Sequence, residues 1–212
     1  NELKKILSIV KGKSGVDFFS HYKQASIFRR VMRRMALNKF DNLEDYHSMI
    51  IKSPKESALL YNDFLINVTS FFRDREFYKT LESKVFPALV KGRDVNDTLR
   101  IWVAGCSTGE EAYSLAICLL EFLKKNKLTI PIQVFASDLD DSAIEAARLV
   151  VYTTSVLQGV PEDYLKKYFI KKDSYYQIIK LVRQQCIFSR HNLLKDPPFP
   201  RIDLISCQNV LI

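Results

Sequence analysis

The chain has 212 residues, 47% of them hydrophobic and 26% charged, and a net charge of +8, which are ordinary values for a globular protein with a sizeable core. Apolar runs stay shorter than a membrane span and the first residues lack a signal-peptide pattern, so we expect no membrane insertion. Four cysteines and three histidines without paired spacing indicate neither a metal site nor a disulfide framework, and we expect a reduced, cytoplasmic setting.

The positive charge is concentrated in the first half of the chain. Residues 1–95 hold 18 Lys and Arg against 11 Asp and Glu, whereas residues 96–212 hold 14 against 13. A basic excess attracts acidic molecules, so we expect an acidic partner for the N-terminal part.

Residues 1–92 are predicted to be helical, and the segment 26–37 has the clearest amphipathic pattern. Its apolar side chains recur on one face of a helix: Ile27, Phe28, Val31, Met32 and Met35. Its arginines are assigned to the opposite face: Arg29, Arg30, Arg33 and Arg34. We expect these four arginines to dock an acidic substrate region. The alternative is a solvated face on a packed helix.

A polar segment, residues 67–74 (NVTSFFRD), interrupts the helices and is predicted to be a loop in which polar side chains flank two aromatics. A further helix is expected at 75–89, and a polar linker follows at 91–98. We therefore predict a helical N-terminal domain over residues 1–92 and a second domain over residues 93–212.

The second domain is organised around residues 99–123, which have the pattern of a strand, a glycine loop and a helix. Apolar residues fill 99–104, the loop is Gly105–Gly109, and apolar residues then recur at three- and four-residue steps. Open α/β sheets bind ligands in loops after parallel strands, and glycine lets the backbone approach a ligand closely. We expect a valine at Gly109 to block the ligand without unfolding the chain.

The residues around this loop indicate which ligand fits. The loop lacks the Gly-Lys-Ser/Thr ending of triphosphate-binding loops, and two acids, Glu110 and Glu111, follow it. A second strand, 132–137, ends at Asp138, where an acid typically holds ribose hydroxyls. A nucleoside with a positive centre and no phosphates fits, and S-adenosylmethionine is such a ligand. The alternatives are structural: an ordinary βαβ turn, Glu111 as an acid at a helix N-terminus and Asp138 as a helix cap.

The rest of the chain is predicted to add a small β-subdomain and one more core strand. Residues 175–182 and 185–189 are β-rich and are expected to form a hairpin, in a subdomain at about 168–190. Residues 202–207 form a buried strand. Because the first residue is not Met and the last residues run into an apolar strand, we expect the sequence to be an excerpt of a longer protein.

Five ordered motifs resemble those of the chemotaxis receptor glutamate methyltransferases, and the resemblance covers nearly the whole chain. The motifs are NVTSFFRD at 67–74, GCSTGEEAYS at 105–114, FASDLD at 135–140, HNLL at 191–194 and CQNVLI at 207–212. The glycine loop and the stretch 195–206 are most similar to the branch in which this domain is fused to a methylesterase domain and sensory modules. One departure is Gln208, where the family usually has arginine.

The resemblance implies an α/β fold with a Rossmann-like class I methyltransferase sheet, here C-terminally truncated, a small β-subdomain and an all-α N-terminal domain. It implies methyl transfer from S-adenosylmethionine to receptor glutamate side chains, giving glutamyl methyl esters and S-adenosylhomocysteine. The implied partners are a methyl-accepting chemotaxis-type receptor with acidic methylation sites and further fused signalling domains.

The resemblance also implies roles for individual residues. The methionine end of the cofactor is bound by Glu111 and the ribose by Asp138, beside the loop that begins at Gly105. The residues implied to contact the cofactor or frame the methyl-transfer site are Asn67, Thr69 and Arg73. The residues implied to line the adenosine side are Asn192, Leu193, Gln208 and Asn209.

Arg73 is expected to be the catalytic residue, because a guanidinium can orient the incoming carboxylate by a bidentate hydrogen bond. The structural alternative for Arg73 is a salt bridge with Asp74. A glutamate carboxylate is ionised near neutral pH, so no general base is expected.

Two other functions stay open from the sequence. A non-catalytic S-adenosylmethionine-binding sensor or docking module is compatible with Gln208 and with the fused contexts. The basic N-terminal half is the only feature that indicates a nucleic-acid methyltransferase. The motifs Asn-Pro-Pro-Tyr and Asp-Pro-Pro-Tyr, which are typical of amino-group methylation in nucleic acids, are missing. Residues 196–199 (DPPF) precede a strand instead of following one. We therefore expect no nucleic-acid partner.

Overall fold

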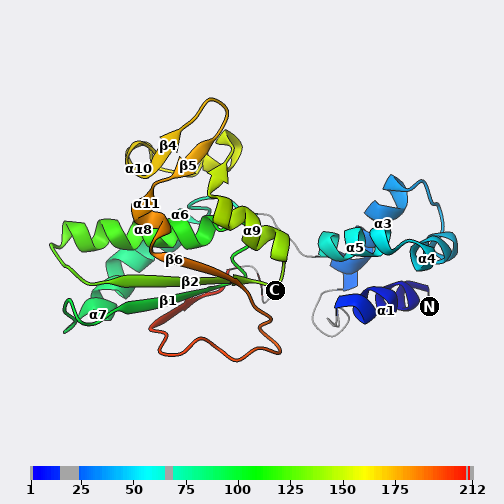
Figure 1. Ribbon diagram of the computed structural model, residues 1–212, viewed down its shortest axis with the longest axis horizontal. Coiled ribbons are helices and arrows are strands. Elements are labelled where there is room, and N and C mark those ends of the chain that lie inside the picture. The colour runs from blue at the N-terminus through cyan, green and yellow to red at the C-terminus, as the bar shows by residue number, and fades with distance from the viewer. Residues whose placement is uncertain (1, 15–23, 65–68, 209, 211–212) are drawn as a thin grey trace. The chain divides into compact units, whose positions relative to one another are not determined.

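The computed structural model of the chain describes residues 2–14, 24–64, 69–208 and 210. The chain divides into two compact units, residues 1–66 and residues 67–211. The first unit is helical and the second is an α/β unit with two sheets (Figure 1). The predicted fold class, a helical domain followed by a parallel α/β sheet and a small second sheet, is confirmed.

The described helices of the first unit pack around one apolar core. They are α1 (Glu2–Ser14), α3 (Gln24–Leu37), α4 (Leu43–Lys52) and α5 (Pro54–Phe64). Helix α5 contacts the other three, and α1 also packs on α4. Fully buried residues of this core include Ile6, Val31, Tyr46, Ile50 and Leu60.

Arg34 departs from the predicted arginine face of α3. Seven residues make nearly two helical turns, so Arg34 lies on the same side of α3 as the buried Ile27. Its guanidinium donates from Nε and Nη2 to the two carboxylate oxygens of Glu56, at 2.8 and 2.6 Å. Burial raises the pKa of Glu56, but the hydrogen bonds from Arg34 and Tyr46 outweigh it and leave that pKa below its usual value. The prediction that Arg34 belongs to an exposed docking face is therefore wrong.

The exposed face of α3 is a mixture of basic and apolar side chains. Arg29 and Arg33 are exposed, and Arg30 is partly buried. Phe28 and Met32 are also exposed, at 44% and 42%, although the sequence pattern assigned them to the buried stripe. The buried apolar stripe of α3 is narrower than predicted: Ile27, Val31 and Met35 are buried, whereas Phe28 and Met32 are not.

The main sheet of the second unit is parallel and has the strand order β6-β2-β1-β7. Its strands are β1 (Leu99–Ala104), β2 (Ile132–Asp138), β6 (Cys186–Arg190) and β7 (Leu204–Ser206). Because the strands are parallel, all four carboxyl ends meet at one edge of the sheet. Helix α8 (Glu110–Lys125) follows β1 and lies over one face of the sheet (Figure 1).

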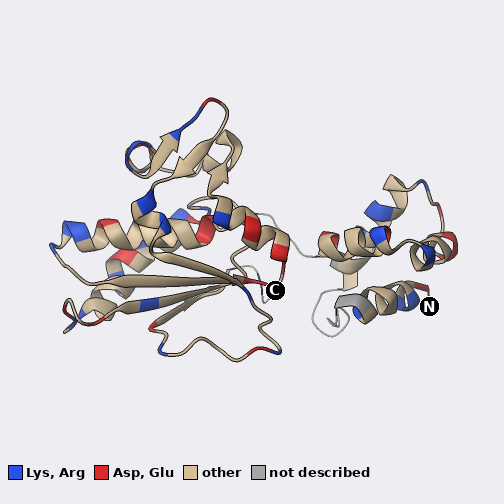
Figure 2. Cartoon of the chain, viewed as in Figure 1, with Lys and Arg blue, Asp and Glu red and all other residues tan. Residues whose placement is uncertain are grey.

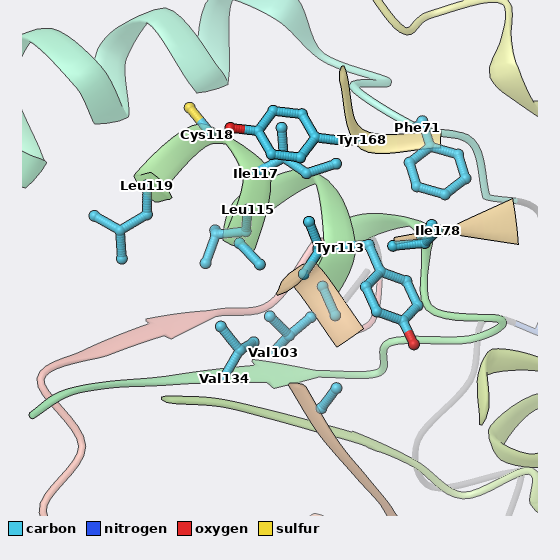
Figure 3. Packing of buried hydrophobic residues seen from close by; sticks show 14 of the residues in the cluster. Phe71, Val103, Tyr113, Leu115, Ile117, Cys118, Leu119, Val134, Tyr168 and Ile178 are labelled. Carbon is cyan, nitrogen blue, oxygen red and sulfur yellow. The ribbon is translucent and has the colours of Figure 1, made fainter. Parts of the chain in front are cut away.

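The core lies between α8 and the sheet. Figure 3 shows Val103 and Val134 of the sheet facing Leu115 of α8, and all three are fully buried. Three short helical segments add Tyr78, Leu81 and Phe86 to the same core. These segments are α6 (Arg75–Thr80), the π-helix η1 (Leu81–Val85) and α7 (Phe86–Val90).

The segments α6, η1 and α7 were predicted to belong to the N-terminal domain, which was expected to end at residue 92. These segments belong to the compact unit that begins at residue 67, because their apolar side chains cover α8. The linker at 91–98 is polar as predicted, but it connects helices and a strand of one unit. Its Arg93 pairs with Asp203, whose carboxylate also accepts the N–H of Arg100 at 2.8 Å.

The other face of the main sheet is covered by the segment 191–203. Phe199 and Ile202 of this segment pack against Trp102 and Phe135 of the sheet. The rings of Phe199 and Phe135 are stacked with centroids 5.1 Å apart. The proline-rich stretch 196–200 is therefore part of the segment that covers the aromatic side chains on this face of the sheet.

The second sheet is antiparallel, has the order β3-β5-β4 and lies on the far side of α8 from the main sheet (Figure 1). It contains β3 (Val151–Tyr152), β4 (Phe169–Lys171) and β5 (Tyr176–Ile178). Helix α9 (Asp141–Leu149) precedes β3 and packs against β2 and β6 of the main sheet. The other helical segments in this stretch of the chain are η2 (Thr154–Leu157), α10 (Glu162–Tyr168) and α11 (Lys180–Arg183). No described helix is both long and apolar enough to cross a membrane.

The predicted hairpin of 175–182 with 185–189 is wrong. Strand β5 pairs with β3 and β4, whereas β6 pairs in parallel with β2 of the main sheet. The small sheet therefore begins near residue 151 and leaves β6 out. Phe188 of β6 is buried against the α8 side of the sheet, which is why this strand belongs to the larger core.

Candidate functional site

The glycine loop after β1 is held by backbone hydrogen bonds to the end of β2. The N–H groups of Gly105 and Cys106 both donate to the carbonyl of Ser137, at 2.8 and 2.9 Å. Gly105, Ser107 and Gly109 all have positive φ, at 75°, 49° and 94°. This left-handed conformation turns the chain sharply from β1 into α8, and glycine adopts it without strain.

Gly109 faces the core. A Cβ added there would lie 3.0 Å from Ala147 Cβ and 3.1 Å from Phe188 Cε1. Glycine is therefore required here for packing as well as for its positive φ. A valine at Gly109 would therefore strain the loop and its packing, so a loss of binding in that variant would not report on the ligand alone.

Asp138 ends β2 and fastens the glycine loop. Its Oδ2 accepts the N–H of Ser107 at 2.8 Å, and its Oδ1 accepts the N–H of Asp140 at 3.0 Å. Burial raises the pKa of Asp138, although these backbone hydrogen bonds oppose the shift. The N-cap of α9 is Asp140, whose carboxylate accepts the N–H of Ser142 at 2.9 Å. Asp138 thus keeps lone pairs for further donors at the edge of the sheet.

The two acids after Gly109 have different surroundings. Glu110 is buried, and the hydroxyl of Thr108 lies 2.9 and 2.7 Å from its two carboxylate oxygens. Glu110 therefore stabilises the loop from the first turn of α8. Glu111 accepts a hydrogen bond on Oε1 from the hydroxyl of Ser206, the last residue of β7, at 2.6 Å.

Glu111 is a desolvated carboxylate that forms no salt bridge within the described residues. Burial raises its pKa to about 7, and the hydrogen bond from Ser206 opposes that shift. Burial and, to a smaller extent, the charge of Glu111 raise the pKa values of Tyr78 and Cys207, so these two neighbours stay neutral near pH 7. A desolvated carboxylate with neutral neighbours favours a positively charged ligand.

The aromatic loop, residues 69–74, is attached to the second unit by its two phenylalanines. Phe71 packs edge-on against Tyr152 with ring centroids 4.8 Å apart, and its carbonyl leaves no room for a side chain at Gly159. The N–H of Phe72 donates to Ser114 Oγ of α8 at 3.1 Å. The prediction of a loop in which polar residues flank two aromatics is confirmed for its described part, and the structure buries both aromatics.

The polar residues of the aromatic loop lie outside the core. Thr69 is partly buried and Arg73 is exposed. Asp74 is the N-cap of α6 and accepts the N–H of Phe77 at 3.2 Å. Asn67 lies outside the described residues.

The segment after β6 forms a compact turn at the same edge of the sheet. The N–H of His191 donates to the carbonyl of Asp138 at 2.9 Å, which places this turn beside the end of β2. Asn192 Oδ1 accepts the N–H of Leu194 at 3.0 Å, and Asn192 N–H donates to Asp196 at 2.7 Å. Leu193 is 38% exposed.

Gln208 follows β7, and its buried Nε2 has no hydrogen-bond partner within the described residues. A buried amide donor without a partner is costly, so it favours a ligand that offers an acceptor. Asn209 lies outside the described residues. A Cβ at Gly105 would lie 2.1 Å from Val210 Cγ2, which shows how closely the chain after β7 approaches the glycine loop.

The parallel sheet brings the predicted cofactor residues of four segments to one edge. Gly105 and Glu111 follow β1 and Asp138 ends β2, whereas Asn192 and Gln208 follow β6 and β7. The first turns of α8 and α9 at this edge carry acidic residues, shown in red in Figure 2. Ser206 was not among the predicted site residues, and its position at the end of a predicted core strand was the available signal.

Comparison with known proteins assigns both parts of the chain. Residues 67–212 match the CheR methyltransferase SAM-binding domain, and residues 1–65 match the CheR methyltransferase all-alpha domain. A chemotaxis protein methyltransferase of Listeria innocua is 34% identical, over 96% of this chain and 75% of its own length. The corresponding protein of Salmonella typhimurium is 31% identical, over 99% of this chain and 72% of its own length.

A third relative is much longer. An uncharacterised 104.1 kDa protein of Rhodobacter capsulatus is 37% identical over 99% of this chain, which spans only 22% of that protein. The family assignment rests on two matching domains and on relatives that are more than 30% identical over most of their length. The chain belongs to the CheR methyltransferase family.

Proposed function

We propose that the chain transfers a methyl group from S-adenosylmethionine to glutamate side chains of a chemotaxis-type receptor, forming glutamyl methyl esters. The observation that carries the proposal is Glu111, a desolvated carboxylate beside the glycine loop. The family supplies the cofactor, and the names of the Listeria and Salmonella relatives supply the connection with chemotaxis. A phosphate-bearing ligand would be repelled by Glu111 and Asp138, so their charges favour a cationic nucleoside.

The residues at the sheet edge fit S-adenosylmethionine. Glu111 would hold the positively charged methionine end, because a carboxylate and an ammonium form a charge-assisted hydrogen bond. Asp138 would accept hydrogen bonds from ribose hydroxyls with its remaining lone pairs. Gln208 and Asn192 would supply amide groups toward the adenosine side, and the unpartnered Nε2 of Gln208 is suited to an acceptor there.

When bound, S-adenosylmethionine supplies a methyl group on a sulfonium, which is a good leaving group. The carboxylate of the receptor glutamate would accept that methyl group, and the sulfur would keep the electron pair of the broken bond and leave as the neutral thioether of S-adenosylhomocysteine. No proton moves, because the carboxylate is already ionised near pH 7. The task of the protein is therefore to align the two reactants and to exclude water.

Arg73 is proposed to orient the incoming carboxylate. It stands on the aromatic loop, which Phe71 and Phe72 anchor to the core of the second unit. The anchored backbone limits the region that the Arg73 side chain can reach, and a guanidinium binds a carboxylate through two parallel hydrogen bonds. Thr69 would frame the same site from the start of this loop.

Replacing Asp138 by asparagine should weaken S-adenosylmethionine binding by about 1–3 kcal/mol, because charged hydrogen bonds to ribose are lost. The control is Asp141→Asn, an exposed acid in the first turn of α9. Calorimetric titration compares the affinities of the two variants for S-adenosylmethionine. Thermal unfolding reports whether loss of the hydrogen bond between Asp138 and the N–H of Ser107 has destabilised the protein. Equal affinities for the two variants would exclude Asp138 from the cofactor site.

We propose that Arg29 and Arg33, with Phe28 and Met32 beside them, dock the acidic methylation region of the receptor. Reversing both charges, Arg29→Glu with Arg33→Glu, should raise the apparent KM for receptor by about tenfold at low salt, since steering is electrostatic. The affinity for S-adenosylmethionine and the melting temperature should stay unchanged.

The matched control carries the same charge change elsewhere on the first unit, Lys52→Glu with Lys55→Glu, both exposed. Added salt should raise the wild-type KM, because it screens exposed charges. A normal KM in the arginine variant would mean that this face is merely solvated.

The direct test uses S-adenosylmethionine labelled in the methyl group, with three acceptors: a receptor fragment rich in glutamate, DNA and RNA. Label that enters the receptor and leaves as methanol in mild base identifies a methyl ester. Binding without transfer to any acceptor would favour the second candidate, a non-catalytic cofactor sensor or docking module. Base-stable label in nucleic acid would overturn the proposal.

We also propose that the chain acts within a larger signalling protein of the branch fused to a methylesterase domain. The support is the 104.1 kDa relative, of which the chain spans 22%. A fused esterase domain would remove the same methyl groups that this domain adds.

A further inference from the structure

Ser206 joins the end of β7 to the start of α8. It is 5% exposed and pairs with Val103 of β1 on the side of the sheet that faces α8. Its hydroxyl donates to Glu111 Oε1 at 2.6 Å, a distance typical of an O–H group bound to an ionised carboxylate. The two residues are 95 positions apart in the sequence, so this contact exists only in the folded chain.

The hydrogen bond uses one of the two oxygens of Glu111. Within the described residues, the other oxygen, Oε2, has no hydrogen-bond partner. A long side chain at a helix start has several rotamers, and a fixed partner on Oε1 restricts them. A donor to the carboxylate also favours its charged form over its neutral form.

We propose that Ser206 is a positioning residue for cofactor binding: its hydroxyl holds Glu111 so that Oε2 stays available to the positively charged end of S-adenosylmethionine. The inference rests on the proposed function, because it requires that Glu111 faces the cofactor. Ser206 itself acts through Glu111.

The ionisation of Glu111 can be measured near pH 7, because the tyrosine and the cysteines around it do not change charge in that range. Tyr78 of α6, Cys106 of the glycine loop and Cys207 after β7 have pKa values raised mainly by burial, so they are neutral near pH 7. Burial also raises the pKa of Glu110, the neighbour on α8, but its carboxylate is bonded to Thr108. Comparison with Glu111→Gln assigns the observed titration to Glu111.

The test compares Ser206→Thr with Ser206→Val in the full chain. The two side chains have the same shape and both suit a strand, but only threonine keeps the hydroxyl. Two quantities are measured: the carboxyl titration of Glu111 by carbon-13 NMR without ligand, and the affinity for S-adenosylmethionine between about pH 6 and pH 9 by calorimetry.

Threonine should behave like serine. Valine should move the Glu111 midpoint upward by about one pH unit, since one hydrogen bond to the charged form is lost. The ionised fraction at pH 7 then falls, and the affinity there should drop roughly fivefold and recover largely at higher pH. A purely structural serine would lower the melting temperature of the valine variant without moving the midpoint.

The outcomes separate the two proposals. Equal midpoints and equal affinity profiles for threonine and valine would overturn the role of Ser206 and leave the proposed function intact. Wild-type protein that fails to bind S-adenosylmethionine at any pH would overturn the proposed function and, with it, this inference.

Discussion

Replacing Glu111 by glutamine should lower the affinity for S-adenosylmethionine by about 2–3 kcal/mol at pH 8, which is roughly 30- to 150-fold. The side chain keeps its size, but the carboxylate that would pair with the positive end of the cofactor is gone. The effect is large because Glu111 is desolvated, and charge pairs are strongest where water is excluded.

The pH dependence of this difference has a defined sign. Burial raises the pKa of Glu111 to about 7, so the wild-type carboxylate loses its charge as the pH falls through that value. Wild-type affinity should therefore drop about tenfold between pH 8 and pH 6, whereas the glutamine variant should change little. Calorimetry in two buffers of different ionisation enthalpy would also detect proton release on binding to wild type near pH 7.

Glu145→Gln is the control for removing one negative charge. Glu145 lies on the exposed surface of α9, where it pairs with Arg148. This variant should bind S-adenosylmethionine like wild type. A Glu111→Gln protein with wild-type affinity at both pH values would remove Glu111 from the cofactor site and leave only its helix-terminal role.

Replacing Arg34 by methionine should destabilise the first unit by about 3–5 kcal/mol, because it leaves Glu56 buried without its cation. Glu56 is 5% exposed and accepts further hydrogen bonds from Asn38 and Tyr46, at 3.0 and 2.9 Å. Methionine keeps most of the apolar stem of arginine, so the loss reports the charge. Thermal unfolding monitored by circular dichroism would measure it.

The matched control is Arg33→Met, one position earlier on the same helix but exposed. It should change stability by less than about 0.5 kcal/mol, as surface substitutions usually do. The folded pKa of Glu56 lies below its usual value, so its contribution is present at neutral pH and is lost as the pH falls through that lowered pKa. Equal stabilities for the two methionine variants would show that the Arg34–Glu56 pair contributes nothing.

The sequence by itself determined the elements that rest on local signals. The strand, glycine loop and helix at 99–123 follow from apolar periodicity and from glycine, and both act over a few residues. The aromatic loop and the strand that ends at Asp138 were predicted for the same reason. The motifs also identified the family, because their order along the chain can be compared without any knowledge of contacts.

The tertiary structure alone decided which elements and side chains meet. A short β-rich run does not encode its partner, so β6 could pair with β2 of the main sheet although a local hairpin was predicted. The helices at 75–90 likewise joined the second unit because α8 offered them an apolar surface.

Side-chain roles depended on the same long-range contacts. Helical periodicity places Arg34 near the buried side of α3, but its burial required Glu56, 22 positions away, to neutralise the charge. The difference between Glu110 and Glu111 arose because Thr108 meets the first and Ser206 of β7 meets the second. The sequence presents the two acids as equivalent neighbours. Folding desolvates both acids, but it bonds Glu110 to Thr108 of the loop and places Glu111 beside Ser206, at the edge where four parallel strands end.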